Sequence, residues 1–155
     1  QMCIRDSCTP ILLLDPAHRA VGIAHGGWKG TVRRIAAKTV LRMQREFGTR
    51  PEDVLAAIGP SIGPCCYEVG PEVERQFQEA FSGHEAALFS HPDAVGGTHL
   101  SLWAANRLQL EEIGVLREHI DEARTCTACH HEDFFSYRAD GGQTGRLGAV
   151  IALRS

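Results

Sequence analysis

The sequence lacks a long apolar run, a basic stripe and an export signal. No apolar run approaches the roughly 20 residues that a membrane-spanning helix requires, so we expect no membrane helix and no membrane partner. Lys and Arg together number 16 against 19 Asp and Glu, and they are not clustered, which argues against a nucleic-acid surface. The first residues do not show a basic region followed by an apolar stretch, so we expect a cytoplasmic protein.

The chain also has too few cysteines to be a disulfide scaffold. Six cysteines among 155 residues are not disulfide-dense, and without an export signal we expect them to be reduced thiols. Hydrophobic residues make up 43% of the chain, which is enough for one domain to bury its own core without covalent staples. We therefore expect a single globular domain.

Residues 1–7 differ from the rest of the chain because they are polar and show no hydrophobic period. The chain begins with Gln1 and runs directly from Ser7 into a strong predicted strand. We predict that residues 1–7 are non-native or a fragment edge, and that residues 8–155 form the main part of one domain.

Apolar patterning predicts alternating strands and helices along the rest of the chain. Strands are predicted at 11–14, 20–24, 54–58 and 147–153, with further strand starts near Val115 and Ile120. Helices are predicted at 31–47, 71–81 and 102–113, and 82–98 is predicted to be irregular. Helices that alternate with strands favour a layered α/β (α+β) domain with a mixed β-sheet flanked by helices.

Cys8 and His25 flank the first two predicted strands. If these strands pair antiparallel through the turn near Pro16, their outer ends meet and Cys8 lies beside His25. Gly26 and Gly27 follow at once, and glycine lets a backbone approach a ligand closely. A thiolate beside an imidazole suits either a Cys–His nucleophile pair or two ligands of a zinc site.

A second cysteine motif spans residues 126–130 and reads C-T-A-C-H. Its spacing matches c-type haem attachment, but that chemistry belongs to exported proteins. A zinc ribbon needs a second C-x-x-C pair, and the adjacent Cys65 and Cys66 do not supply one. His130-His131-Glu132 resembles half of a zinc deaminase signature, but the P-C-x-x-C half does not follow it. We therefore expect a cysteine-bearing loop without a ligand here.

A third candidate lies near the C-terminus, where Phe134-Phe135-Ser136-Tyr137-Arg138 precedes Thr144-Gly145-Arg146. Two arginines near glycines can clamp a phosphate or a carboxylate through paired hydrogen bonds. Taken alone, the motif is equally typical of a core Phe pair followed by solvated arginines.

Together these stretches resemble the laccase-domain family, which is also described as multicopper-polyphenol-oxidase-like or YfiH. Five ordered motifs carry the resemblance: 8–11 (C-T-P-I), 24–30 (A-H-G-G-W-K-G), 58–70 (I-G-P-S-I-G-P-C-C-Y-E-V-G), 103–108 (W-A-A-N-R-L) and 134–138 (F-F-S-Y-R) with Gly145-Arg146. The departures are Ser7, Gly26, Lys29, Ser101 and Ala139, where the family has Asp, Ala, Arg, Asp and a second basic residue.

The resemblance implies a mononuclear zinc site of two histidines and one cysteine. It assigns Cys8 and His25 as two of the three ligands, at the family's separation. The other family histidine stands in an upstream V-H-G motif, to which nothing in this sequence corresponds. The third ligand, a His, is therefore expected upstream, and the chain is expected to be truncated at its N-terminus.

The resemblance further implies a zinc-dependent purine nucleoside phosphorylase, acting on adenosine, inosine and methylthioadenosine, with adenosine deaminase activity. Three protein ligands leave a fourth zinc position open, and zinc lowers the pKa of bound water to about 7, giving a hydroxide able to attack C6 of adenine. Phosphorolysis needs a phosphate held by cations. Candidates to bind phosphate or substrate are Lys29, Ser136, Arg138 and Arg146.

Three alternatives stay open. In a metal-free hydrolase, Cys8 is the nucleophile and His25 the base. A copper-dependent phenol oxidase, with copper in place of zinc, is disfavoured because the chain has only two methionines and its eight histidines are scattered. In the third alternative the chain is an inactive fragment that binds no metal.

Overall fold

The computed structural model describes residues 2–4, 8–91 and 96–154. Its strands are β1 (Met2–Ile4), β2 (Thr9–Asp15), β3 (Ala20–Gly26), β4 (Leu55–Ile58), β5 (Glu68–Val69), β6 (Phe89–Ser90), β7 (Thr98–Leu100), β8 (Ile120–Glu122) and β9 (Leu147–Ala149). Its helices are α1 (Trp28–Val32), α2 (Ile35–Phe47), α3 (Pro71–Ala80), α4 (Glu85–Leu88) and α5 (Leu102–Glu112), with short 3₁₀ turns at Pro51–Asp53 and Arg117–His119.

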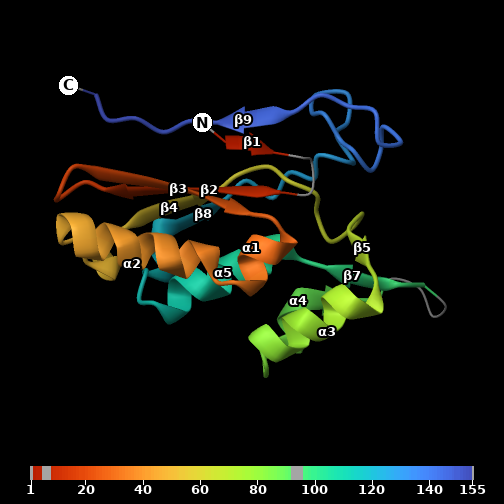
Figure 1. Ribbon diagram of the computed structural model, residues 1–155, viewed down its shortest axis with the longest axis horizontal. Helices are drawn as coiled ribbons and strands as arrows, with labels where there is room; N and C mark the ends of the chain where they lie inside the picture. The colour runs from red at the N-terminus through yellow and green to blue at the C-terminus, as the bar shows by residue number, and fades with distance from the viewer. Residues whose placement is uncertain (1, 5–7, 92–95, 155) are drawn as a thin grey trace.

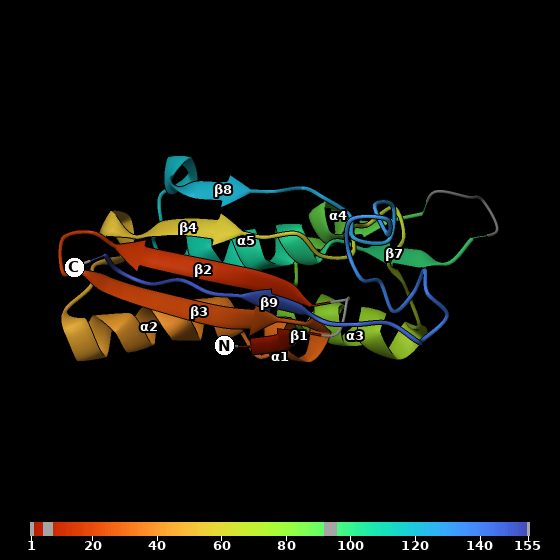
Figure 2. The ribbon, with the colours of Figure 1, turned by 90° about the horizontal axis from the view of Figure 1, so that it is seen from above.

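The central sheet has the strand order β3-β2-β4-β8. Strand β2 runs antiparallel to β3 and to β4, whereas β4 and β8 are parallel, so the sheet is mixed as predicted. Figure 1 shows α1, α2 and α5 on one face of this sheet, and Figure 2 shows β9 and the C-terminal segment crossing over the other face. The prediction of a layered α/β domain is therefore confirmed.

The main core lies between the sheet and α2. In β2 the side chains of Ile11 and Leu13 point to this face and are fully buried, because alternate residues of a strand share a face. They belong to one apolar cluster with Ala36, Val40 and Met43, which are the buried residues of α2 at helical spacing. The hydrophobic period of this segment was thus interpreted correctly.

The prediction of one continuous helix over 31–47 is wrong. Helix α1 ends at Val32, and Arg34 adopts a left-handed conformation with φ of 62° before α2 begins at Ile35. The buried side chain of Gln109 stabilises this break: its amide donates to the Thr31 carbonyl at 3.0 Å, and its oxygen accepts from the Ala36 N–H at 3.2 Å. The hydrogen bonds from Gln109 of α5 therefore break the helix that the local apolar period predicts.

Three other expectations need correction. Residues 82–98 are not wholly irregular, since they contain α4, β6 and the first residue of β7. No strand begins at Val115: its N–H bonds to the Leu110 carbonyl and closes α5, with Gly114 at φ of 101°. Strand β9 covers only Leu147–Ala149 of the predicted 147–153.

The first residues of the chain are described only in part. Met2–Ile4 form β1, which pairs antiparallel with β9. Residues 1 and 5–7 lie outside the described residues, so the origin of residues 1–7 stays a prediction. Within the described ranges, none of the helices combines the length and the apolar character needed to cross a membrane.

Candidate functional site

The β2–β3 hairpin brings Cys8 and His25 to the same end of the sheet. Thr9 lies opposite Gly26 and Pro10 lies opposite His25, so Cys8 precedes the first pair of the register. A Cβ placed on Gly27 would lie 3.1 Å from the Cys8 Sγ and 3.4 Å from the His25 Nε2. The thiol and the imidazole therefore face the same side of Gly27, where a larger residue would crowd them.

The protonation of His25 suits a metal ligand. His25 is half-buried, and this burial lowers its pKa below the ordinary value, so the imidazole is neutral at neutral pH. A thiolate and a neutral imidazole are ligand types that zinc binds. Among the described residues, no group of three or more metal-ligating side chains includes Cys8 or His25. This part of the chain thus supplies two candidate ligands.

A buried hydrogen-bond network fixes the chain that follows His25. The Thr31 hydroxyl donates to the Gly26 carbonyl at 3.0 Å, and the Asn106 amide donates to the Thr31 hydroxyl at 3.1 Å and to the Leu102 carbonyl at 2.9 Å. Thr31 and Asn106 are fully buried. These two residues were not predicted as part of the site, although Asn106 stands in the fourth of the five motifs.

A second network supports the chain that follows Cys8. The hydroxyls of Thr9 and Ser61 are 2.9 Å apart, and the Trp103 indole N–H donates to the Ser61 hydroxyl at 2.6 Å. Ser61 lies in the loop after β4, whereas Trp103 lies on α5. Three of the sequence motifs therefore meet behind Cys8, which explains why Ser and Trp stand at these positions.

A mainly apolar cavity of about 190 Å³ opens beside Cys8. Its walls include Pro10, Pro60, Phe134 and Leu147, so the C-terminal strand helps to enclose it. A larger hollow of about 590 Å³ lies over the sheet face at Leu12, Leu14 and Ile151 but does not include Cys8 or His25. Of these two cavities, the smaller one adjoins Cys8.

The candidate phosphate-binding cations are exposed and come from separate segments. Lys29 lies on α1, with its Nζ 5.4 Å from the Trp28 ring centroid. Arg138 donates to the Glu68 carbonyl at 3.3 Å and lies over the Tyr67 ring.

Arg146 lines a small hollow of about 140 Å³ together with Tyr137, Gly142, Thr144 and Gly145. Ser136 differs from the cations because it is fully buried, and its hydroxyl accepts from the Ala139 N–H at 3.3 Å. It thereby stabilises the turn that carries Arg138.

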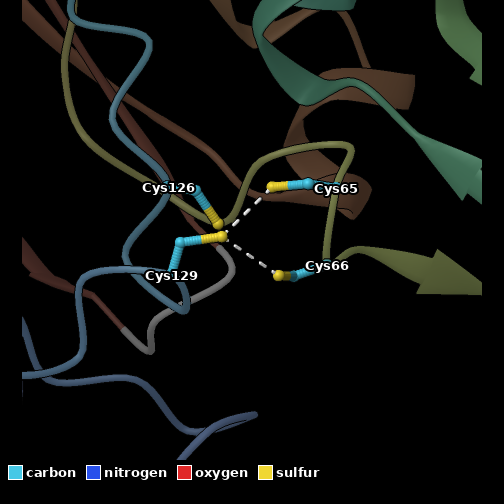
Figure 3. A group of neighbouring side chains, drawn as sticks. All are labelled: Cys65, Cys66, Cys126 and Cys129. Carbon is cyan, nitrogen blue, oxygen red and sulfur yellow. Dashed lines mark hydrogen bonds between the residues drawn. The ribbon is translucent and has the colours of Figure 1, made fainter.

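A four-cysteine cluster lies at the ends of β4 and β8. Cys65 and Cys66 follow β4, Cys126 and Cys129 follow β8, and their four sulfur atoms all lie within 4.8 Å of one another (Figure 3). The expectation of a loop without a ligand assumed that Cys65 and Cys66 do not act as a second cysteine pair, but in the structure they lie beside Cys126 and Cys129. Both cysteine pairs lie in loops that follow predicted strands, but no signal in the sequence indicates that these two strands are neighbours.

The thiols of this cluster differ in acidity. Burial and the neighbouring Cys129 thiol raise the pKa of Cys66 to about 11, and they raise that of Cys65 further. Burial also opposes ionisation of Cys126, but backbone N–H groups of Gly63, Cys129 and Ala128 directed at its sulfur lower its pKa to about 7. The Gly63 N–H lies 3.2 Å from that sulfur.

Comparison with known proteins identifies the family of this chain. A sequence model described as multi-copper polyphenol oxidoreductase laccase matches residues 2–154. A purine nucleoside phosphorylase of Bacteroides thetaiotaomicron is 43% identical over 154 residues, which cover 98% of this chain and 56% of the relative. An adenosine deaminase, RL5, from an unknown prokaryotic organism is 41% identical over 139 residues, which cover 90% of this chain and 52% of the relative.

A solved structure agrees with these sequence matches. The hypothetical protein YfiH of Bacillus licheniformis superposes with a TM-score of 0.85 at 40% identity, over 93% of this chain and 53% of that protein. The chain spans about half the length of the curated relatives it matches. The match over almost every residue shows that this chain belongs to the multi-copper polyphenol oxidoreductase laccase family.

Proposed function

We propose that this chain carries part of the active site of a zinc-dependent purine nucleoside phosphorylase that also deaminates adenosine. The single observation that carries the proposal is the placement of the Cys8 thiol and the His25 imidazole around Gly27. Relatives named purine nucleoside phosphorylase and adenosine deaminase support the choice of reactions. The substrates would be adenosine, inosine or methylthioadenosine, with inorganic phosphate.

Cys8 and His25 would hold the zinc ion, together with a histidine supplied from outside this sequence. Bound zinc would supply a Lewis acid with a position open to water or substrate. The neutral imidazole of His25 offers its lone pair without first losing a proton. The Thr31–Gly26 hydrogen bond holds the backbone of the residue that follows His25.

The exposed cations would hold the phosphate. Phosphorolysis places a phosphate oxygen against C1′ of the ribose, so the negative charge must be oriented and partly neutralised. Arg138 and Arg146 offer planar guanidinium groups that can bind phosphate with two hydrogen bonds, and Lys29 offers a point charge. The buried Ser136 would act indirectly, by shaping the turn before Arg138.

The test is to incubate the chain with zinc, phosphate and adenosine and to separate the products by chromatography. We expect adenine with ribose 1-phosphate from phosphorolysis, and inosine from deamination. His25→Gln should lower kcat/KM by at least about 100-fold, because loss of a ligand costs more than loss of a supporting group. The matched control His84→Gln changes an exposed histidine of another segment and should keep full activity.

Each alternative gives a different contrary result. Full activity after chelation of the metal would favour a metal-free Cys–His hydrolase. Oxidation of phenols that depends on added copper would favour the oxidase. Absence of product with zinc present would favour the inactive fragment, and any of the three overturns the proposal for this chain.

A further inference from the structure

The four-cysteine cluster is built from two loops that leave the same edge of the sheet. Strands β4 and β8 are parallel, with Ile58 opposite Glu122, so the segments that follow them start side by side. An isolated parallel bridge between Ser61 and Cys126 continues the pairing beyond the strands. Two further bonds, from the Ser61 N–H to the Thr125 carbonyl and from the Thr127 N–H to the Ser61 carbonyl, tie the loops together.

The spacing of the sulfur atoms matches one metal ion. The Cys129 Sγ lies 3.5 Å from the Cys65 Sγ and 3.5 Å from the Cys66 Sγ. Four thiolates around a tetrahedral zinc ion, with Zn–S bonds of about 2.3 Å, stand about 3.8 Å apart. Sulfur atoms that all lie within 4.8 Å therefore need only small movements to surround an ion.

The backbone around the cluster is arranged for close approach. A Cβ placed on Gly63 would lie 2.7 Å from the Trp103 ring and 3.1 Å from the Cys126 Cβ, so only glycine fits beside the cysteines. The N–H groups of Cys66 and Tyr67 both donate to the Gly63 carbonyl, at 3.0 Å each, which folds Cys65 and Cys66 into a turn.

A backbone hydrogen-bond donor also lies at the Cys126 sulfur, on the β8 side of the cluster. The Gly63 N–H donates to the Cys126 sulfur at 3.2 Å, as described above. Amide hydrogens directed at sulfur stabilise the thiolate form that binds a metal. The scaffold thus offers a hydrogen-bond donor where a metal–thiolate centre would carry negative charge.

We propose that Cys65, Cys66, Cys126 and Cys129 form a second metal site, which binds one Zn²⁺ through four thiolates and links the β4 and β8 loops. Binding releases the four thiol protons and leaves no open coordination position, so the site is structural rather than catalytic. It shares no ligand with the Cys8–His25 pair and does not rest on the proposed function.

A disulfide explains the same cluster less well. The Cys129 sulfur lies 3.5 Å from the sulfur of Cys65 and 3.5 Å from that of Cys66 (Figure 3), and it can form a disulfide with only one of them. Such a bond would shorten one sulfur–sulfur distance to about 2.05 Å, and a second disulfide would be needed to use the other two cysteines. A single ion accounts for all four positions.

The test uses cobalt as a spectroscopic substitute for zinc. The full chain, purified under reducing conditions and freed of metal, is titrated with Co²⁺, and the sulfur-to-cobalt charge-transfer band is recorded. We expect a band of tetrahedral tetrathiolate type that disappears when Zn²⁺ is added. Cys129→Ser should remove much of this band, whereas the control His84→Gln, which changes an exposed histidine outside both proposed sites, should keep it.

A second variant and a measurement on the unmodified chain keep the test valid if Cys129→Ser does not fold. The exposed Cys65 can be replaced by Ser instead, and the band should then fall to that of a three-thiolate site. In the unmodified chain, Zn²⁺ should protect Cys65, Cys66, Cys126 and Cys129 from alkylation, as peptide mass mapping would report. Alkylation of these cysteines unchanged by Zn²⁺, a cobalt spectrum unaffected by Cys129→Ser, or a metal-free disulfide at Cys129 under reducing conditions would each overturn the proposal.

Discussion

Asp15 shows how a single buried carboxylate shapes the hairpin that carries the site. It ends β2, and its Oδ1 accepts the N–H groups of Ala17 and His18 at 2.9 and 3.1 Å, while its Oδ2 lies 2.8 Å from the His18 Nδ1. Burial alone would raise the pKa of Asp15, but the hydrogen bonds hold it below its ordinary value. The ionised carboxylate therefore stabilises the turn.

This predicts how stability depends on pH. Because the pKa of Asp15 is lower in the folded than in the unfolded chain, its contribution is present above about pH 4 and is lost as the pH falls through the folded pKa. Asp15→Asn should lower the free energy of unfolding by about 1–3 kcal/mol at pH 7, and the difference should shrink in acid. Urea denaturation across this pH range checks it, and an equal loss at every pH would contradict it.

Arg138 offers a second test at the scale of one residue. If its guanidinium holds phosphate, Arg138→Ala should raise the KM for phosphate by about 10-fold or more, because a charged hydrogen bond contributes about 1.5–3 kcal/mol. The KM for the nucleoside should change less. Arg117→Ala is the matched control, since that side chain is 79% exposed in the 3₁₀ turn before β8. Equal kinetic effects of the two substitutions would remove Arg138 from the phosphate site.

At the scale of elements, Gly30 in the middle of α1 lets this helix pack closely against the end of β3. A Cβ at Gly30 would lie 2.7 Å from the His25 carbonyl oxygen, and a backbone atom cannot rotate away as a side chain can. Gly30→Ala should therefore lower the free energy of unfolding by about 1–3 kcal/mol and reduce metal binding at His25. The control is Gly70→Ala, where nothing lies within 4 Å of the added Cβ. Thermal denaturation of both variants measures this difference. Equal loss of stability in Gly30→Ala and Gly70→Ala would contradict the prediction.

The sequence correctly predicts the elements that depend on local hydrophobic patterns and not on a distant side chain. The strands at 11–14 and 20–24 appear inside β2 and β3, because short apolar runs bounded by a turn are typical of strands. The break at Arg34 could not be predicted, since the Gln109 side chain that holds it lies on α5, far along the chain. The prediction of a strand near Val115 was wrong because the Val115 N–H bonds to the Leu110 carbonyl and ends α5.

At the scale of the whole molecule, one candidate site could be predicted from local sequence, whereas the other depends on segments that are distant in the sequence. Local hairpin geometry sufficed to predict that Cys8 and His25 lie together, and the β2–β3 register agrees. The four-cysteine cluster depends instead on a parallel pair of strands that are distant in sequence, and no spacing rule within one segment describes it. Parallel pairing was therefore the missing piece of information.

That parallel pair also has a consequence for the order of folding. The hairpin of β2 and β3 closes through a short turn, whereas β4 and β8 meet only after a long loop has been ordered. Cys65 and Cys126 consequently stay apart until this slow step is complete. The rate at which their thiols become neighbours during refolding, captured by a rapid bifunctional thiol reagent, would time the closure of the central sheet.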